Sequence, residues 1–498
     1  MAKKKKEGED ENRCVLTLPL LTEPYQEHLI EKRFKIMEHL INSLIGLELR
    51  KLKSLERRKD YRLLMEEIEK RPKDERKQLY AKRNKMIRDA GFSEFSFKDD
   101  MSPMQKHFSE HIATHVAHKA ASDVWRSFDK YFFGNGNKVH FKRRGTLNSI
   151  ANQKVGNGMD YKDGYFSWNG GRSPNQIKML IRVAAPTTDY EQLMLQKKIK
   201  NLRIIRKWMK TRYKYYLQFN LVGSAEKKDR AVAEGRVGID MGTQSIAIVA
   251  ERAVHLWELA DRVNDNHEAI LKLQRKMDNS RRAMNPENYN PDGTVCRGKR
   301  LVWKSSRRYL RLAGKVRDLQ RKNAAIRKYQ HICLANYILS IGNDVVIEQM
   351  NYKDLQKRAK ETKKDKSGRY LRKKRFGKSL ANKAPAMFVD ILSRKLGQYG
   401  GIMEKVDTWS FKASQYDHLS KKYVKKQLSQ RKHELENGDV LQRDLYSAFL
   451  LMNAADTLDM PDDDRCAFTY DSFKQLHDIE MRRLEENTEK NLSSFGVS

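Results

Sequence analysis

The chain lacks any run of about 18 consecutive apolar residues, the length that a membrane-spanning helix needs. It begins with MAKKKKEGEDENR, a charged stretch without the apolar core of a secretory signal. The lysine run 3–6 within that stretch predicts a solvated tail that is also able to touch nucleic acid. These absences argue against membrane-spanning and secreted proteins, and we expect a cytoplasmic one.

Cysteine is scarce and scattered, and no C-x-x-C pair occurs. The four residues are Cys14, Cys296, Cys333 and Cys466. This scatter provides neither a disulfide framework nor the ligand spacing of a zinc site. It suits a protein that works in a reducing compartment.

Acidic residues are outnumbered, with 64 Asp and Glu against 101 Lys and Arg, a net charge of +37. A net charge of roughly 2–8 is enough to keep a small domain soluble. The excess therefore indicates a polyanionic partner, of which nucleic acid is the commonest. A ribosome-associated or generally adhesive protein would carry the same charge. The chain of 498 residues, 39% of them hydrophobic, is long enough for two to four domains with real cores.

The residue pattern changes along the chain, and no internal repeat is found. CVLTLPLL (14–21) is typical of a strand, and Thr22 is placed to cap a helix with Pro24 in its first turn. Charged helical segments follow, with breaks expected at RPKDE and DDMSP. A β-rich module spans 135–222, residues 233–452 mix strand and helix patterns, and the remainder is acid-rich.

Four histidines lie three or four residues apart in HFSEHIATHVAHK (107–119), which predicts one helix face: His107, His111, His115 and His118. Pairs of the form H-x-x-x-H are able to bind zinc. No thiol partner accompanies them, so a packed or polar helix face is the better interpretation.

Asp240 stands inside EGRVGIDMGTQSIAIVA (234–250), a segment that otherwise has the β-branched residues of a buried strand. An aspartate is costly to bury unless it is paired or coordinates a cation. A second acid, Glu348, ends the apolar strand of GNDVVIEQMNY (342–352). A third, Asp444, starts an apolar helix in GDVLQRDLYSAFLLMNAA (438–455).

Each of these acids lies where a hydrophobic element meets its end, and a fold is able to bring such ends together at one edge of a sheet. Clustered carboxylates repel one another unless a divalent cation offsets their charge. Magnesium prefers oxygen ligands, and two such ions about 4 Å apart support phosphodiester hydrolysis. A nuclease site would explain both the acids and the basic composition. The alternative is three unrelated acids at helix caps and strand ends.

Three motifs carry a family resemblance. VGIDMGTQSIAIV, VVIEQMNYKDL and QRDLYSAFLLMNAA resemble the RuvC-type motifs of the TnpB transposon-encoded nucleases and of the compact type V CRISPR effectors. A long basic stretch (about 262–332) between the first two motifs keeps the family's order. The segment MFVDILSRKLGQYGGIMEKVDTWSFKASQ resembles the helix and strand before the family's zinc knuckle. The match covers roughly residues 233–455, and the N-terminal half matches by layout only.

The resemblance implies a multidomain α+β fold. A charged tail (1–13) would precede a wedge β-barrel (14–21 and 135–222), into which a helical recognition lobe (22–134) is inserted. A RuvC-like, RNase H-like α/β nuclease domain (233–406 and 439–455) would follow and hold a degenerate zinc-finger-like insertion (407–438). An acid-rich tail (456–498) would end the fold.

The resemblance also implies an RNA-guided DNA endonuclease with Asp240, Glu348 and Asp444 as catalytic Mg²⁺ ligands at a single RuvC site. Its partners would be a guide RNA and double-stranded target DNA, with pairing reading the target and the protein reading a short adjacent motif. It would work in a prokaryotic cytoplasm with access to the nucleoid. A transposon-encoded or CRISPR-associated origin, and a monomer or homodimer, both stay open.

The chain departs from the family at the zinc knuckle. Aligning the flanks places Asp417, Ser420, Glu434 and Asn437 at or near the expected cysteines. His418 and His433 remain, but two histidines without thiolates are weak evidence for a zinc site. We therefore predict no structural zinc.

Clusters of cations predict nucleic-acid contacts in three places. The β module offers His140, Lys142, Arg143 and Arg144. The basic bridge offers Arg307, Arg308, Arg311, Arg321, Arg327 and Lys328. A lid-like segment after the second motif (353–383) offers Arg372, Lys373, Lys374 and Arg375. Ordinary exposed lysines on barrel strands would explain the first group equally well. A disordered charged loop would explain the third group and is compatible with the same role.

Other functions fit part of the pattern. GIDMGTQS also resembles the first phosphate loop of the sugar-kinase, actin and heat-shock ATPase group, but no second glycine-rich phosphate turn follows. A guided DNA-binding repressor with a silent nuclease would keep the basic surfaces. A DDE-type transposase would use the same acids, although nothing resembles its DNA-end-binding domain.

Overall fold

The structure is a computed structural model that describes residues 12–134, 136–170, 175–227, 229–296, 298, 300–357, 361, 376–425, 427, 430–486 and 492–497. The chain divides into two compact units, Met1–Glu226 and Lys227–Ser498. The hydrophobic core of each unit is built from that unit's own residues. No helix among the described residues is long and apolar enough to cross a bilayer.

The N-terminal unit is built on a seven-stranded antiparallel sheet. In its first strand every second residue, from Cys14 to Leu20, is buried, while the residues between them are more exposed, as expected when one face of a strand is covered. The strand expected at 14–21 is therefore confirmed. The order is β2-β6-β7-β1-β5-β4-β3, with bounds β1 Arg13–Leu21, β2 Ser149–Ala151, β3 Met159–Lys162, β4 Tyr165–Trp168, β5 Met179–Val183, β6 Ile199–Met209 and β7 Arg212–Val222.

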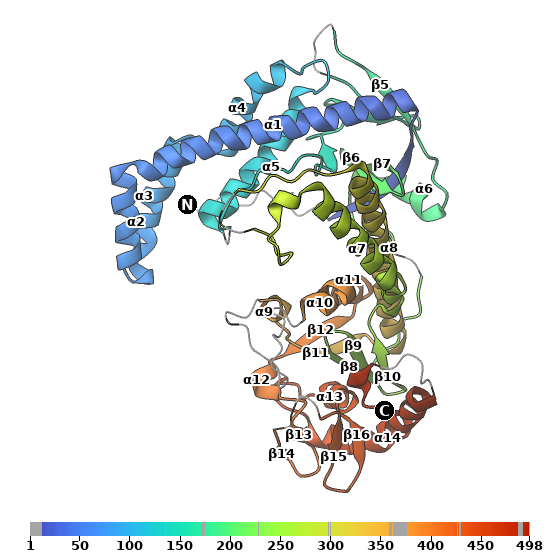
Figure 1. The fold of residues 1–498 in the computed structure, drawn as a ribbon. Coiled ribbons are helices and arrows are strands. Elements are labelled where there is room, and N and C mark those ends of the chain that lie inside the picture. Colours follow the sequence, from blue (N-terminus) through green and yellow to red (C-terminus); the bar gives the residue numbers. More distant parts are fainter. Residues whose placement is uncertain are drawn as a thin grey trace. The chain divides into compact units, whose positions relative to one another are not determined.

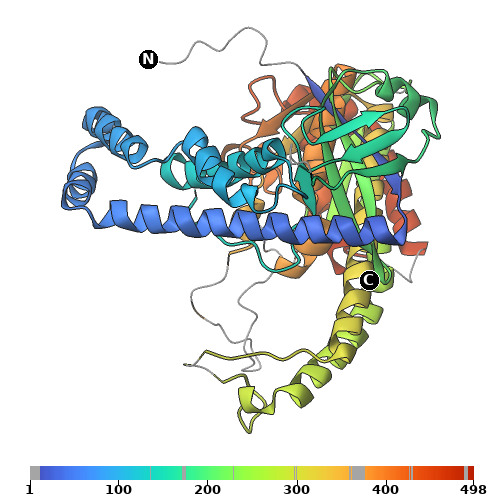
Figure 2. The same cartoon turned by 90° about the horizontal axis from the view of Figure 1, so that it is seen from above.

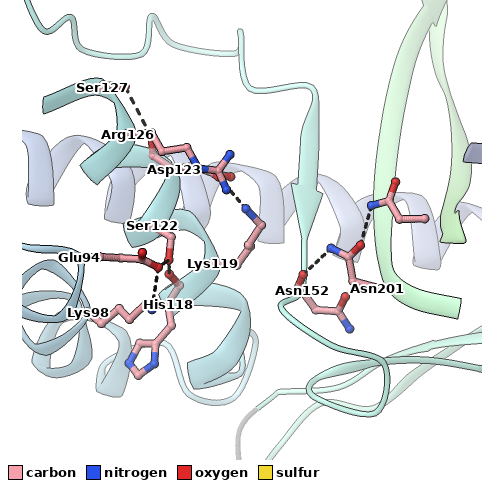
Figure 3. Close-up of polar contacts among 11 residues, drawn as sticks. Glu94, Lys98, His118, Lys119, Ser122, Asp123, Arg126, Ser127, Asn152 and Asn201 are labelled. Carbon is pink, nitrogen blue, oxygen red and sulfur yellow. Dashed lines mark hydrogen bonds and ion pairs between the residues drawn. The ribbon is translucent and has the colours of Figure 1, made fainter. Parts of the chain in front are cut away.

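Strand pairing does not close this sheet into the expected barrel, because β2 and β3 are its two edges among the described residues. The buried Asn152, just after β2, joins the two ends instead. Its Nδ2 donates to the carbonyl oxygen of Met159 at 2.9 Å, and its Oδ1 accepts from the Leu202 N–H at 2.9 Å. Asn201 Nδ2 donates to the Asn152 carbonyl at 2.9 Å (Figure 3). The sheet is thus curled, and the Asn152 side chain links β3 to β6.

Helices pack on the sheet and share one core with it. Figure 2 shows α1 as one long helix with α2 and α3 beyond its C-terminal end. Glu23, one residue after the expected Thr22, is the N-cap of α1, and its N–H donates to Gln26 Oε1 at 2.9 Å. The bounds are α1 Pro24–Arg57, α2 Lys59–Lys70, η1 Lys73–Glu75, α3 Arg76–Asp89, α4 Glu94–Lys106, α5 Thr114–Phe133 and α6 Asp189–Leu195.

Of the two helix breaks that the sequence predicts in this region, one is wrong. RPKDE separates α2 from α3 as expected. DDMSP instead lies inside α4, which contains Pro103 and continues to Lys106. Proline removes one backbone donor and disfavours a helix interior, but packing is able to override this preference. The chain turns between residues 107 and 113.

This turn separates the four histidines of the predicted helix face. His107 and His111 lie in the turn, whereas His115 and His118 lie in α5. The expected continuous face is therefore not formed. Polar contacts join α4 to α5 here: Ser122 Oγ donates to Glu94 Oε1 at 2.8 Å, and Lys98 Nζ pairs with the same oxygen at 2.8 Å (Figure 3).

The C-terminal unit is built on a mixed five-stranded sheet with the order β10-β9-β8-β11-β12. β8, β11 and β12 are parallel, and β9 and β10 continue the sheet antiparallel. Buried side chains on its two faces form two separate cores, one against α8 and α11 and the other against α13 and α14. The bounds are β8 Arg236–Met241, β9 Ser245–Ala250, β10 Ala253–Glu258, β11 Asp344–Glu348 and β12 Ile402–Val406.

The helices of this unit include an antiparallel hairpin of α7 and α8 (Figure 1). The bounds are η2 Asp261–Asn266, α7 His267–Met284, η3 Pro286–Asn288, α8 Arg307–Ile341, α9 Tyr352–Leu355, α10 Gly377–Lys383, α11 Pro385–Tyr399, α12 Thr408–Phe411, α13 Arg443–Met452, α14 Asp463–Glu486 and η4 Ser493–Phe495. Two short hairpins lie between α12 and α13: β13 Tyr416–Asp417 with β14 Lys422–Tyr423, and β15 Lys432–Glu434 with β16 Val440–Gln442.

The segment 456–498, expected to be an acid-rich tail, contains the packed helix α14. Its Glu480 is 3% exposed and accepts a hydrogen bond from the Leu256 N–H of β10 at 2.8 Å. Since β10 is an edge strand, this carboxylate satisfies a backbone donor that would otherwise be free. Arg483 pairs with the same carboxylate at 2.6 Å. A charged residue here therefore protects the sheet edge.

Candidate functional site

Asp240 and Glu348 lie on the same face and at the same edge of the sheet. β8 and β11 are parallel, and Gly238 is in register with Val346. Side chains two residues apart lie on the same face of a strand. Asp240 therefore lies on the same face as Gly238, and Glu348 on the same face as Val346. Val346 belongs to the core on the α13 side. Both acids are therefore on the α13 face, at the carboxyl ends of neighbouring strands.

Helix α13 runs antiparallel to β8, which brings its N-terminus to the same edge. Just beyond the C-terminal end of the helix, the Ala454 carbonyl accepts from Arg236 Nη1 at 2.6 Å, and Arg236 starts β8. Gly238 touches the middle of the helix, since a Cβ atom there would stand 1.9 Å from the Ala448 carbonyl oxygen. Asp444 lies one turn before Ala448, so the direction of α13 places it on the side of Asp240.

Burial disfavours the charged form of all three carboxylates, and neighbouring charges add to this effect at Asp240. Burial raises the pKa of Asp240 well above its usual value, and the Asp444 and Glu348 carboxylates raise it further. Burial raises the pKa of Glu348 to about 7. Burial also raises the pKa of Asp444, while Arg443, Arg431 and the Gln442 side chain oppose that rise. Asp444 and Glu348 therefore lie near enough to Asp240 to disfavour its ionisation.

This donor set fits a hard divalent cation. Carboxylate oxygens are the ligands that Mg²⁺ prefers, and a cation would offset the repulsion that Asp444 and Glu348 exert on Asp240. No three His, Cys, Asp or Glu side chains of the described ranges are arranged to hold one metal ion together. Mg²⁺ commonly takes only one or two carboxylates and completes its shell with water and phosphate oxygens.

Two arginines flank the carboxylates. Arg443 Nε lies 3.8 Å from Asp444 Oδ1, and its Nη1 donates to the carbonyl oxygens of Gln427 at 3.3 Å and Gln430 at 3.2 Å. Arg431 acts on Asp444 electrostatically, and its carbonyl accepts the Arg443 N–H at 2.9 Å. Positive charge at this edge would favour the approach of a phosphate group.

Two residues near the carboxylates were missed as site residues. Gly238 allows α13 to approach, and a glycine within a strand is a sequence signal of close backbone packing. Tyr352, in α9, has a buried hydroxyl without a hydrogen-bond partner among the described residues, and Asp240 contributes to raising its pKa. Nothing in the sequence distinguishes this tyrosine from a core residue.

The insertion between α12 and α13 packs on Tyr446 of α13. The Tyr446 hydroxyl accepts the His418 N–H at 3.1 Å and lies 2.8 Å from His418 Nδ1. The ring of His433 contacts the other side of this cluster, 4.6 Å from the Tyr446 ring. Both histidines are buried. The side chains predicted to stand near lost zinc ligands thus belong to an aromatic core.

Two of those positions also make turns. Asp417 Oδ1 accepts the N–H groups of Leu419 at 2.9 Å and of Ser420 at 3.4 Å. Asn437 Oδ1 accepts the Asp439 N–H at 3.1 Å. Side-chain hydrogen bonds of this type shape a turn without a metal.

In the N-terminal unit the predicted basic residues of the β module lie on one clamped loop. Glu38 of α1 accepts the Gly145 N–H with both carboxylate oxygens, at 3.0 and 2.8 Å. Asn42 of α1 exchanges two hydrogen bonds with the Lys142 backbone, at 2.9 and 2.8 Å. The side chains so presented are exposed and make no ion pair within the described chain: His140, Lys142, Arg143 and Arg144.

The structure divides the predicted bridge residues into two groups. Four are exposed on α8 without an ion pair to other described residues: Arg307, Arg308, Arg311 and Lys328. Arg321 instead pairs with Asp318 at 2.9 Å. Arg327 Nη1 donates to the carbonyls of Ala381 at 2.9 Å and Asn382 at 3.0 Å. These last two guanidinium groups serve the fold. Arg372, Lys373, Lys374 and Arg375 lie outside the described residues.

A cavity of about 700 Å³ lies away from the carboxylates, at the β10 edge of the sheet. Its walls come from β10, η2, α8, α14 and the chain after α14, and they include Trp257, Arg262, Tyr337 and Phe495. None of the three acids lines it, so it is not part of the candidate site.

No protein-family model and no curated protein sequence matches the chain. A cryo-EM structure of a Cas12f1–sgRNA–target DNA complex aligns over 89% of this chain and 99% of that chain, with 10% identity and a TM-score of 0.47. A CRISPR–Cas12f ternary complex aligns over 86% and 82%, with 13% identity and a TM-score of 0.24. The mini RNA-guided endonuclease CRISPR–Cas_phi3 aligns over 56% of each chain, with 10% identity and a TM-score of 0.29. Similarities this weak establish neither fold nor family.

Proposed function

We propose that this protein is an RNA-guided DNA endonuclease of the TnpB and compact type V class, with Asp240, Glu348 and Asp444 as its Mg²⁺ ligands. The observation that carries the proposal is the convergence of these acids. They come from two parallel strands and one helix, more than 90 residues apart in sequence, and burial together with the Asp444 and Glu348 carboxylates raises the pKa of Asp240.

In this proposal the chain contributes oxygen ligands, phosphate-binding charge and shape. Asp240 and Glu348 would offer oxygen ligands from the sheet, and Asp444 would offer one from α13. Bound Mg²⁺ would supply an activated water and stabilise the leaving oxygen of the phosphodiester. Arg443 and Arg431, beside Asp444, would attract the scissile phosphate. The exposed cations of α8 and of the loop at 140–145 would bind the RNA and DNA backbones.

The test is expression of the protein with its native flanking DNA, followed by sequencing of the copurified RNA. We expect one discrete RNA with a constant scaffold and a variable end. Repeats in the scaffold would indicate a CRISPR array, and a transposon-end sequence would indicate TnpB. Absence of an enriched RNA would refute guide use.

The complex is then given DNA that matches the variable end. Wild type should cut it in Mg²⁺, whereas Asp240→Asn should bind it without cutting. Asp265→Asn, the same change at an exposed aspartate of η2, should cut normally. Guided binding without cutting by wild type would replace the proposal with a guided repressor, and undiminished cutting by Asp240→Asn would remove the assigned site.

A further inference from the structure

Helix α14 lies beyond the three motifs, yet one of its residues contacts the start of the catalytic helix α13. His477 is 2% exposed, and its Nε2 lies 3.0 Å from the Gln442 backbone nitrogen. Its Nδ1 lies 2.9 Å from Asp478 Oδ1. Asp478 is itself held by Lys474 at 2.5 Å.

These contacts define the tautomer of His477. The Gln442 N–H is a donor only, so Nε2 must be the acceptor and carry no proton. The single proton of the neutral ring is then on Nδ1 and is donated to the Asp478 carboxylate. Burial lowers the pKa of His477, which keeps the ring neutral near pH 7. This is the way in which a carboxylate orients a functional imidazole.

Gln442 connects this pair to the candidate site. It is the N-cap of α13, and its Oε1 accepts the Leu445 N–H at 2.7 Å. With Oε1 committed, the Nε2 group is buried and has no hydrogen-bond partner within the described chain. Asp444, two residues further along the chain, is the nearby acceptor, and the Gln442 side chain lowers its pKa. The backbone of Gln442 therefore sets where its amide and Asp444 stand.

We propose that His477 and Asp478 are positioning residues for Asp444: Asp478 orients the His477 ring, and the ring holds Gln442 so that the start of α13 presents Asp444 at the carboxylate cluster. This inference rests on the proposed nuclease function. It assigns α14 a role in cation binding that none of the three motifs contains.

A purely structural role for α14 is the alternative, and the helix offers a matched control. Glu480, one turn after His477, is equally buried and joins α14 to β10 instead of α13. Glu480→Gln perturbs the docking of α14 without touching Gln442. His477→Gln keeps an acceptor near the position of Nε2, whereas His477→Leu removes it.

The experiment compares these variants as the RNA-bound full chain. Loss of an outer-shell partner commonly lowers metal affinity or activity by 10–100-fold. For His477→Leu we expect the Mg²⁺ concentration for half-maximal cutting to rise about tenfold, with guided DNA binding unchanged. His477→Gln should recover most of the loss, and Glu480→Gln should keep the wild-type Mg²⁺ dependence.

Amide hydrogen exchange of the metal-free complex is the second measurement. His477→Leu should speed exchange in the peptide containing Gln442 and Leu445, and Glu480→Gln should not. Wild-type exchange and Mg²⁺ dependence in His477→Leu, or equal losses in both variants, would overturn the proposal. If wild type cuts no DNA at all, the nuclease function fails separately, and unchanged exchange in His477→Leu would still overturn the link between His477 and α13.

Discussion

Gly238 of β8 and Ala448 of α13 are in backbone contact: a Cβ atom at Gly238 would stand 1.9 Å from the Ala448 carbonyl oxygen and 2.3 Å from the Met452 nitrogen. The helix therefore rests directly on the strand. This contact determines how far Asp444 lies from the sheet, and the position of the third carboxylate depends on the absence of one methyl group.

Gly238→Ala should displace α13 and reduce both stability and cutting. Overpacking of a core typically costs about 1–3 kcal/mol, and a clash with backbone leaves little room for relaxation. We expect a loss at the upper end of that range by thermal unfolding. Gly397→Ala in α11 is the control, because nothing lies within 4 Å of its added Cβ and alanine favours a helix. Wild-type stability of Gly238→Ala would contradict the close packing.

Mg²⁺ should stabilise the protein through the carboxylate cluster. In EDTA the carboxylates repel one another, so Asp240→Asn should unfold at a higher temperature than wild type at pH 8. Added Mg²⁺ should raise the unfolding temperature of wild type and of Asp265→Asn, but have little effect on Asp240→Asn. An equal Mg²⁺ effect on all three proteins would place the cation elsewhere.

Stability of the N-terminal unit should fall as pH rises, because of Glu48 in α1. Its side chain is fully buried, and burial, reinforced by Asp100, raises its pKa to about 8, although Lys51 at 3.3 Å opposes the rise. An unfolded glutamate ionises near pH 4.3, so between about pH 4.5 and 8 only the unfolded state gains the charge. Below that window both states are neutral, and stability is greatest.

Glu48→Gln should remove this dependence. The gain in unfolding temperature over wild type should be small at pH 5 and grow toward pH 8, as thermal unfolding across this range would reveal. Glu66→Gln changes an exposed glutamate of α2, and its unfolding temperature should vary with pH in parallel with that of wild type. Parallel curves for Glu48→Gln as well would show that Glu48 is charged in the folded protein.

The insertion should be held by Tyr446 and not by zinc. Tyr446→Phe removes the hydroxyl that bonds His418 and should lower stability by about 1–3 kcal/mol, because a buried partner is left unsatisfied. Limited proteolysis should become faster within residues 412–438. Tyr423→Phe alters a half-exposed ring and serves as the control. A near-stoichiometric zinc signal in mass spectrometry of the purified protein would contradict this account.

The clamped loop of the N-terminal unit should bind RNA by charge. Replacing Lys142, Arg143 and Arg144 together by alanine should weaken RNA binding and reduce its dependence on salt, because each phosphate contact contributes to the slope. Arg143→Lys with Arg144→Lys keeps the charge and should retain the slope. Filter binding over a series of salt concentrations is the measurement. An unchanged slope in the alanine variant would exclude the loop from the RNA interface.

Local pattern was sufficient for the parts of this protein that depend on neighbouring residues. The segment 14–21 predicted β1, the β-branched run at 234–250 predicted a strand that the structure divides into β8 and β9, and the run before Glu348 predicted β11. A lone acid inside or at the end of these runs singled out Asp240 and Glu348. The apolar spacing after Asp444 predicted α13. Where packing opposed a local preference the pattern failed, as for Pro103, which lies within α4.

What the tertiary structure alone decided is which distant residues meet. The sequence does not distinguish Arg327 from Arg311, yet only Arg327 donates to the carbonyl oxygen of Ala381, 54 residues further along the chain. Nothing local connects His477 to Gln442, or Gly238 to Ala448. Strand and helix periodicity arises from neighbours a few bonds apart, whereas such contacts depend on strand register and on the direction of α13. That direction is set by packing over the whole core.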